Sequence, residues 1–89
     1  MSYGEIEQAV IEIIANKLKA DAARIHPETR LIEDLGADSM NSVEIPWDIA
    51  EKFLIYIGDN DIQSARTVAD IVRLVADALH VDRPSAVEA

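Results

Sequence analysis

One serine in this sequence stands where its hydroxyl could do chemistry. Ser39 follows Gly36-Ala37-Asp38, at the point where a loop leads into a predicted helix. The first backbone N–H groups of a helix have no partner within it and lie at the positive end of the helix dipole, so they would stabilise a phosphate attached to this hydroxyl. Asp and Ser are also the commonest helix N-caps. By residue type, Asp38-Ser39 is therefore either a phosphodiester attachment site or an ordinary cap.

The rest of the chain offers little else for catalysis or metal binding. It contains no cysteine, no glycine-rich phosphate loop and neither an HExxH nor a GxSxG motif. His26 in the loop and His80 at a helix end have no evident partners and are interpreted as surface histidines. A calcium loop beginning at Asp59 would need glycine at its sixth position, where the sequence has Ser64. We therefore expect no catalytic residues and no metal ligands.

Composition limits the chain to one small aliphatic domain. Its 89 residues are 49% hydrophobic but only 4% aromatic, and a chain this short buries about 60% of the surface that its unfolded form exposes. The lack of cysteine excludes a disulfide-stapled fold. No apolar run approaches the ~18 residues of a membrane span, and the N-terminus has no signal-peptide pattern. We expect one soluble, cytoplasmic, monomeric domain over residues 1–82 and a flexible tail over residues 83–89.

The charge of the chain is strongly negative and unevenly spread. Acidic residues outnumber basic ones by 17 to 8, which gives a net charge of −9, so nucleic acid is not an expected partner. Residues 33–61 contain one base, Lys52, and the acids Glu33, Asp34, Asp38, Glu44, Asp48, Glu51, Asp59 and Asp61. This stretch is either a solvated face or a docking surface for basic proteins.

Apolar spacing predicts a first helix over residues 3–19, followed by a long loop. Ser2 and Glu5 form a capping box at the start of the helix. Its apolar face consists of Ile6, Ala9, Val10, Ile13, Ile14 and Leu18. Periodicity then fades over residues 21–37, and we expect Ile25, Leu31, Ile32 and Leu35 to pin this loop to the core. This connection is longer than the usual loop between two helices, which indicates a functional role.

A second helix is predicted over residues 39–53 with two separate apolar faces. Ile45, Ile49 and Phe53 form a core face, whereas Met40, Val43, Trp47 and Leu54 form a second stripe, bordered by the acids Glu44, Asp48 and Glu51. Pro46 has no N–H for the carbonyl of Ser42, so we expect a bend of more than ~20° or a break between Ser42 and Trp47. The bend either changes partner specificity or is a tolerated defect.

The last part of the chain predicts a short helix and a third main helix. Residues 58–61 have the composition of a turn, and residues 62–65 could form one helical turn. Thr67 and Asp70 form the capping box of the last helix, which Pro84 closes. Its apolar face consists of Val68, Ile71, Val72, Val75, Ala78 and Leu79. The periodicity therefore predicts an all-α fold of three main helices and a short one.

Residues 29–44, with the sequence TRLIEDLGADSMNSVE, resemble the loop and modification motif of the acyl carrier proteins. In that family the serine of an Asp-Ser-Leu triplet receives 4'-phosphopantetheine. The resemblance covers most of the chain, from about Ile6 to Leu79, and implies a four-helix bundle. It implies Ser39 as the attachment site and Asp38 as the acid that helps a transferase and its magnesium ion engage it. Met40 takes the place of the leucine that is the third residue of the family's Asp-Ser-Leu triplet.

The resemblance also implies a function. Members of the family are non-catalytic carriers of acyl groups, held as thioesters in fatty-acid, lipid or polyketide-type biosynthesis. Their partners are a phosphopantetheinyl transferase, an acyl-ACP synthetase or acyltransferase, and ketosynthase-type enzymes with basic docking surfaces. By this resemblance Glu44, Asp48 and Glu51 dock partners, and Met40 and Val43 flank the arm. Trp47, which shares the stripe of Met40 and Val43, is expected to bind partners together with Val43.

The sequence departs from the family pattern at Pro46, Trp47 and Leu54, which indicates a specialised rather than a housekeeping carrier. Trp47 could instead belong to the core, as lone tryptophans of small domains often do. Two other functions stay open. One is a peptidyl or aminoacyl carrier, which is usually less acidic, and the other is an acidic helical adaptor without a cofactor.

Overall fold

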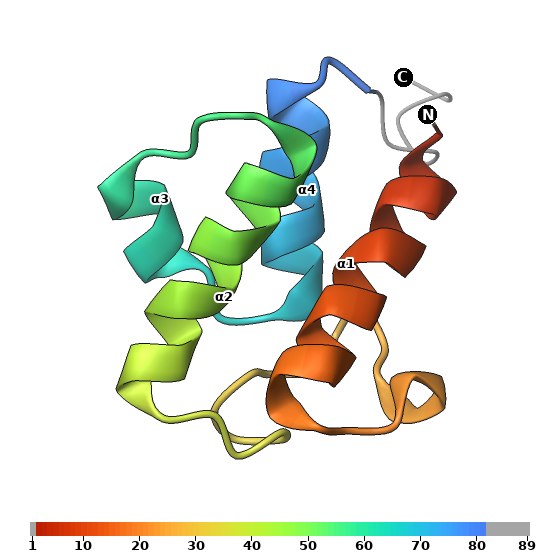
Figure 1. Ribbon diagram of the computed structural model, residues 1–89, viewed down its shortest axis with the longest axis vertical. Coiled ribbons are helices and arrows are strands. Elements are labelled where there is room, and N and C mark those ends of the chain that lie inside the picture. Colours follow the sequence, from red (N-terminus) through yellow and green to blue (C-terminus); the bar gives the residue numbers. More distant parts are fainter. Residues whose placement is uncertain (1, 82–89) are drawn as a thin grey trace.

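The fold is an all-α bundle, as the sequence predicted. The computed structural model describes residues 2–81. Its elements are α1 (Tyr3–Leu18), a 3-10 turn η1 (Ala22–Arg24), α2 (Ser39–Phe53), α3 (Asp59–Ser64) and α4 (Val68–Ala78). In Figure 1, α1, α2 and α4 surround a common interior, α3 lies on the side of α2 away from α1, and the loop between α1 and α2 crosses one end.

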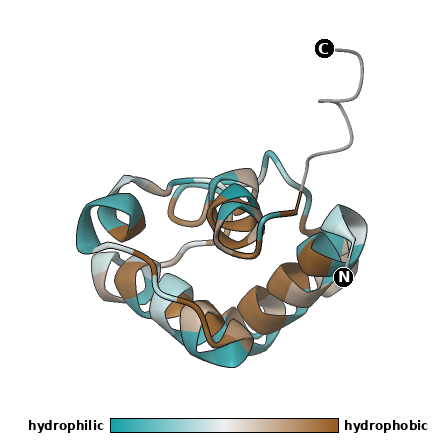
Figure 2. Cartoon of the chain, turned by 90° about the horizontal axis from the view of Figure 1, so that it is seen from above, coloured by the Kyte–Doolittle hydropathy of each residue, from teal (hydrophilic) through white to brown (hydrophobic). Residues whose placement is uncertain are grey.

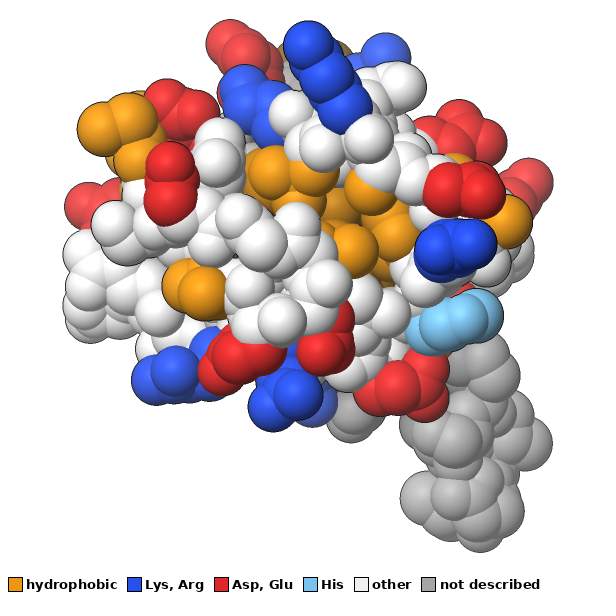
Figure 3. Space-filling model, turned by 90° about the horizontal axis from the view of Figure 1, so that it is seen from below, with side chains coloured by type: hydrophobic (Ala, Val, Ile, Leu, Met, Phe, Trp, Pro, Cys, Tyr) orange, Lys and Arg blue, Asp and Glu red, His pale blue; other side chains and the backbone are white. Residues whose placement is uncertain are grey.

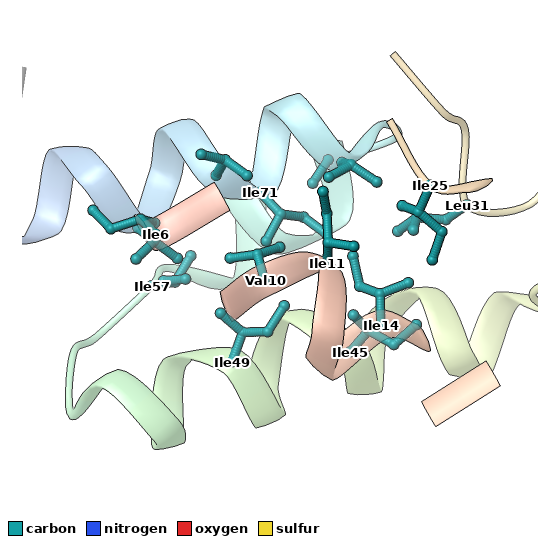
Figure 4. Close-up of a cluster of buried hydrophobic side chains, with 14 of the residues drawn as sticks. Ile6, Val10, Ile11, Ile14, Ile25, Leu31, Ile45, Ile49, Ile57 and Ile71 are labelled. Carbon is teal, nitrogen blue, oxygen red and sulfur yellow. The ribbon is translucent and has the colours of Figure 1, made fainter. Parts of the chain in front are cut away.

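The interior is filled by aliphatic side chains from the three long helices and the loops. The hydrophobic parts of the helices turn inward (Figure 2), and Figure 4 shows side chains of α1, α2 and α4 meeting in one cluster. Fully buried members include Ile6, Val10, Ile14, Ile45, Ile49, Ile71 and Val75. Among the described residues no polar or charged side chain is buried. The bundle is therefore held chiefly by the hydrophobic effect.

α1 has the predicted capping box but a broader buried face than its strict spacing predicted. The Ser2 hydroxyl accepts the Glu5 N–H, and the Glu5 carboxylate accepts the Ser2 N–H. Ile11 and Ala15 are buried although the sequence analysis omitted them, whereas the predicted Ala9, Ile13 and Leu18 are only half-buried. The reason is that α1 packs against both α2 and α4, so it needs two adjoining apolar faces.

The long loop is tied to the start of α4 by backbone hydrogen bonds. The N–H of Leu31 donates to the carbonyl of Arg66 (3.0 Å), and the N–H of Val68 donates to the carbonyl of Thr29 (3.0 Å). Leu31 is buried, and so is Ile25, as predicted. The prediction for Ile32 is wrong, since 49% of it is exposed.

The α3 region forms a longer helix than the sequence predicted. α3 begins at Asp59, so residues 59–61 form its first turn instead of a separate turn. Acidic residues are favourable at this end of a helix, and Ile62 anchors it in the core.

α4 has the predicted Thr67–Asp70 capping box and ends at Ala78. Ala76 is buried in place of the predicted Ala78, which is exposed. Pro84 and the predicted tail lie outside the described residues.

α2 continues through its proline. The helix is unbroken from Ser39 to Phe53, so the predicted break between Ser42 and Trp47 is wrong. Pro46 is fully buried next to Ile45, which places its ring in the core instead of in solvent. Burial of the ring helps to offset the missing hydrogen bond.

A bend of more than ~20° at Pro46 stays a prediction. We expect the angle between the axes of residues 39–45 and 47–53 to decrease in Pro46→Ala, because alanine restores the N–H and removes the clash with the Ser42 carbonyl. Crystal structures of the two proteins measure this angle. Equal angles in both would show that the proline does not bend α2.

The capping box of α4 makes a second prediction. Burial opposes ionisation of Asp70, but hydrogen bonds from the N–H groups of Arg66 and Thr67 outweigh it and hold the pKa of the carboxyl below its ordinary 3.8. Asp70→Ala should therefore lower the free energy of unfolding by about 1 kcal/mol at pH 7, as for a lost helix cap. This stabilisation is fully present at pH values above the ordinary pKa of the Asp70 carboxyl. It is lost as the pH falls through the lower pKa that the carboxyl has in the folded protein. Urea unfolding at pH 7 and pH 3 should show a smaller difference at pH 3, and an equal difference would contradict this role.

Candidate functional site

Asp38 is the N-cap of α2, and Ser39 is its first helical residue. The Asp38 carboxylate accepts the N–H of Asn41 at 2.7 Å, and its carbonyl accepts the N–H of Ser42 at 3.0 Å. The sequence left open which of the two residues forms the cap, and the structure assigns it to Asp38. Ser39 is therefore not needed as a cap.

The hydroxyl of Ser39 is accessible and lies beside unused backbone donors. The side chains of Ser39 and Met40 are exposed. Within residues 2–81, the hydrogen bonds of the helix start use the N–H groups of Asn41 and Ser42, and none uses those of Ser39 or Met40. The Ser42 hydroxyl already forms a hydrogen bond, since it donates to the Ser39 carbonyl at 2.8 Å. A phosphate on Ser39 would thus meet free N–H donors at the positive end of α2.

The loop before Ser39 is folded tightly onto itself. The N–H of Ala37 donates to the carbonyl of Leu31 (3.0 Å), and the N–H of Gly36 donates to the carbonyl of Ile32 (3.0 Å). Gly36 has φ +74°, a left-handed conformation that suits glycine. Ala37 is buried, a core contact that the sequence analysis missed because one alanine in a loop has no periodicity. These contacts fix the place where α2 begins.

The second apolar stripe of α2 lies on the surface. The exposed fractions of Met40, Val43, Trp47 and Leu54 are 68%, 37%, 59% and 90%. Trp47 therefore does not belong to the core, and the alternative that placed it there is wrong. The core face of α2 consists of Ile45 and Ile49, with Phe53 half-buried.

The three acids named for docking lie in different environments. Glu44 and Glu51 are exposed, and within the part of the chain that the structure describes neither forms an ion pair. Asp48 is half-buried and pairs with Lys17 of α1, with 2.7 Å between its Oδ2 and the Lys17 Nζ. The hydrogen bond that the Lys17 ammonium donates to Asp48 raises the pKa of Lys17, and the charge of Glu44 adds to this. Asp48 is thus already neutralised within the molecule.

Two open hollows of about 340 Å³ each flank Trp47. One lies between α2 and α3, with Ala50, Ile57 and Ile62 among its lining residues. The other lies toward α1 and is lined by Lys17, Val43, Glu44, Trp47 and Asp48. The sequence analysis did not predict either hollow, because the approach of α3 and of α1 to α2 depends on tertiary packing.

The two histidines and the potential metal ligands form no further candidate site within the described residues. His26 and His80 are exposed, as expected of surface histidines. Residues 2–81 contain no cluster of ligand side chains suited to a metal ion, and no helix in that range could span a membrane. Seen from the end at which α2 begins, apolar atoms gather in a hollow between acidic and basic side chains (Figure 3).

Comparison with known proteins agrees with this geometry. Residues 8–75 match the family described as having a phosphopantetheine attachment site. An acyl carrier protein of Syntrophobacter fumaroxidans is 40% identical over 76 residues, which cover 85% of this chain and 94% of that protein. One of Rickettsia typhi is 40% identical over 73 residues, 82% of this chain and 85% of that protein. The structure of the acyl carrier protein from Enterococcus faecalis superposes with a TM-score of 0.73 at 27% identity, over 88% of this chain and 99% of that one. The chain therefore belongs to the acyl carrier protein family.

Proposed function

We propose that this protein carries acyl intermediates on a 4'-phosphopantetheine arm attached to Ser39. The observation that supports this most directly is the exposed Ser39 hydroxyl at the start of α2, beside backbone N–H groups that Asp38 leaves free. When attached, the arm supplies a terminal thiol that holds acyl groups as thioesters, a group that the cysteine-free chain lacks. The protein itself is a carrier and performs no catalysis.

The residues at the start of α2 fit the phosphodiester of such an arm. The free N–H groups of Ser39 and Met40 would donate to its oxygens, and the helix dipole would favour its charge. Met40 is a flexible apolar side chain that could contact the arm in several positions. One oxygen of Asp38 accepts the Asn41 N–H, and the other is proposed to engage the magnesium ion of a transferase.

A phosphopantetheinyl transferase is proposed to load Ser39 from coenzyme A. The Ser39 Oγ forms the new bond to the phosphorus next to the pantetheine arm. The phosphoanhydride bond to the nucleotide breaks, and the serine proton leaves to a base of the enzyme or to water. Since Ser39 does not cap α2, its modification leaves the helix start intact.

The exposed face of α2 is the proposed docking surface for partner enzymes. Glu44 and Glu51 would attract Lys and Arg beside a partner's active site, whereas Asp48 is already paired with Lys17. Such contacts raise the association rate without requiring tight binding, which suits a carrier that visits several enzymes. Val43 and Trp47 supply apolar contact next to these acids. The proposed partners beyond the transferase are an acyl-ACP synthetase or acyltransferase and ketosynthase-type enzymes of fatty-acid, lipid or polyketide-type biosynthesis.

The attachment site makes the first functional prediction. Incubation with coenzyme A and a promiscuous phosphopantetheinyl transferase should add one arm to the wild type and none to Ser39→Ala, measured by intact mass. Ser42→Ala, one turn later in α2, is the matched control and should load like the wild type. Because Ser39 is exposed and is not the cap, its replacement should change the free energy of unfolding by no more than about 0.5 kcal/mol. A fully loaded Ser39→Ala protein would overturn the assignment.

The acids of α2 make a second functional prediction. Glu44→Lys with Glu51→Lys should slow loading by the transferase roughly ten-fold or more at low salt, because electrostatic steering is lost. Raising the salt to about 0.15 M, where the Debye length is ~8 Å, should slow the wild type toward the variant. The control is Glu12→Lys with Glu28→Lys, which makes the same charge change on exposed residues outside α2. If both double variants loaded at the same rate, net charge and not this face would govern docking.

A further inference from the structure

A further hollow, larger than the two beside Trp47, lies between the segment after α1 and the loop that leads to Ser39. Its volume is about 590 Å³. We call it the loop hollow, and its lining residues are Ala20, Asp21, Arg24, Thr29, Asp34 and Leu35. Ala20 and Leu35 are only half-buried, so they offer apolar surface to a ligand. Figure 3 views the molecule from this end and shows apolar atoms in a hollow between acidic and basic side chains.

The two carboxylates of the loop hollow already serve the fold. Asp21 caps η1, because its carboxylate accepts the N–H of Ala23 at 3.0 Å. Asp34 accepts the backbone N–H of Arg30 at 2.8 Å and lies 3.4 Å from the guanidinium of the same residue. Both acids therefore have partners, and Arg24 is the charged group of this hollow that is left to bind a ligand.

Arg24 differs in this respect from the basic residues of the other hollows. Lys17, beside Trp47, pairs with Asp48, and Arg73, between α3 and α4, pairs with Asp70 at 2.8 Å. Within residues 2–81 Arg24 forms no ion pair, and its side chain is exposed. A guanidinium binds a carboxylate through two parallel hydrogen bonds. The loop hollow thus combines apolar surface with an unused site for a carboxylate.

The geometry favours a ligand that is tethered to Ser39. Leu35 lines the loop hollow and precedes Ser39 by four residues, which span at most about 14 Å. One exposed guanidinium binds a free carboxylate only weakly. A short flexible tether raises the effective concentration of a ligand to roughly the millimolar range, which allows a weak site to be occupied. An acyl group on an arm at Ser39 has such a tether.

The hollow between α2 and α3 does not suit a carboxylate. Three acids, Asp48, Glu51 and Asp59, line it, and among the described residues no base does. A negatively charged group would be repelled there, whereas an uncharged chain would meet the apolar Ile57 and Ile62. The charges of the two hollows therefore favour different acyl groups.

We propose that the loop hollow binds acyl groups that end in a carboxylate, with the Arg24 guanidinium donating to the carboxylate and Leu35 contacting the methylene groups. The inference rests on the proposed attachment of the arm to Ser39 and adds to it a binding site and a class of cargo. A carboxylated acyl group would lie against the loop, outside the bundle. An uncharged acyl group of the same length would not be held there.

Two acyl groups of equal length test this proposal. A promiscuous transferase loads Ser39 from glutaryl- or pentanoyl-coenzyme A, and intact mass confirms one arm on each protein. The two groups differ only at their ends, where glutaryl has a carboxylate and pentanoyl a methyl group. In amide NMR spectra we expect glutaryl to shift the signals of Thr29 and Leu35, and pentanoyl to leave them as they are with an unacylated arm. The charge-assisted hydrogen bonds should favour the docked glutaryl group roughly ten-fold.

The variant Arg24→Gln separates binding from folding. It removes the charge of an exposed residue and keeps a polar side chain, so its melting temperature should equal that of the wild type. Lys19→Gln is the matched control, because Lys19 is also exposed, has no ion pair within residues 2–81 and does not line the loop hollow. The glutaryl shifts should disappear in Arg24→Gln and persist in Lys19→Gln.

Three results would overturn the proposal: equal shifts with pentanoyl, glutaryl shifts that persist in Arg24→Gln, or glutaryl shifts confined to residues of the α2–α3 hollow such as Ile57. Loading is measured separately by mass. A protein that accepts neither group contradicts the proposed function. One that accepts both groups without a response at Thr29 and Leu35 refutes this inference alone.

Discussion

The position of Ser39 depends on the backbone hydrogen bonds that join the first loop to the start of α4. Leu31 pairs with Arg66, Thr29 with Val68, and Pro27 accepts the N–H of Ala69 at 2.7 Å. These bonds satisfy backbone groups that a loop lying against the core would otherwise leave without partners. The burial of Leu31 then makes the loop part of the hydrophobic core. The loop thus acts as a structural element that sets where α2 begins.

α2 divides its apolar residues between a buried face and an exposed face. Ile45 and Ile49 fill the interior, while Met40 and Trp47 remain in solvent on the other side. Apolar side chains that stay this exposed, 68% for Met40 and 59% for Trp47, contribute little to the stability of a monomer. Apolar side chains that gather on a surface are typical of interaction sites. In this chain of 89 residues, these side chains are apolar surface that the small core does not use.

Local signals predicted most of the fold and the place of Ser39 at the start of α2. Both capping boxes, the bounds of α2 and the exposed stripe followed from residue types and spacing, because each depends on neighbours in sequence. The errors arose where tertiary contacts decide. Ile32, which was predicted to lie in the core, is exposed, and Ala37, for which the sequence made no prediction, is buried, since backbone pairing sets which side of the loop faces inward. The Lys17–Asp48 ion pair depends on how α1 packs against α2, and no pattern within either helix indicates it.

The Lys17–Asp48 ion pair has a consequence for the proposed docking of partner enzymes. A partner ammonium that reached Asp48 would replace Lys17 and would not form an additional ion pair, so the exchange would gain little free energy. When the partner withdraws, Lys17 is at hand to take its place again, and Asp48 is not left without a counter-ion. In the proposed docking, release of a partner at this carboxylate therefore costs no more free energy than its association.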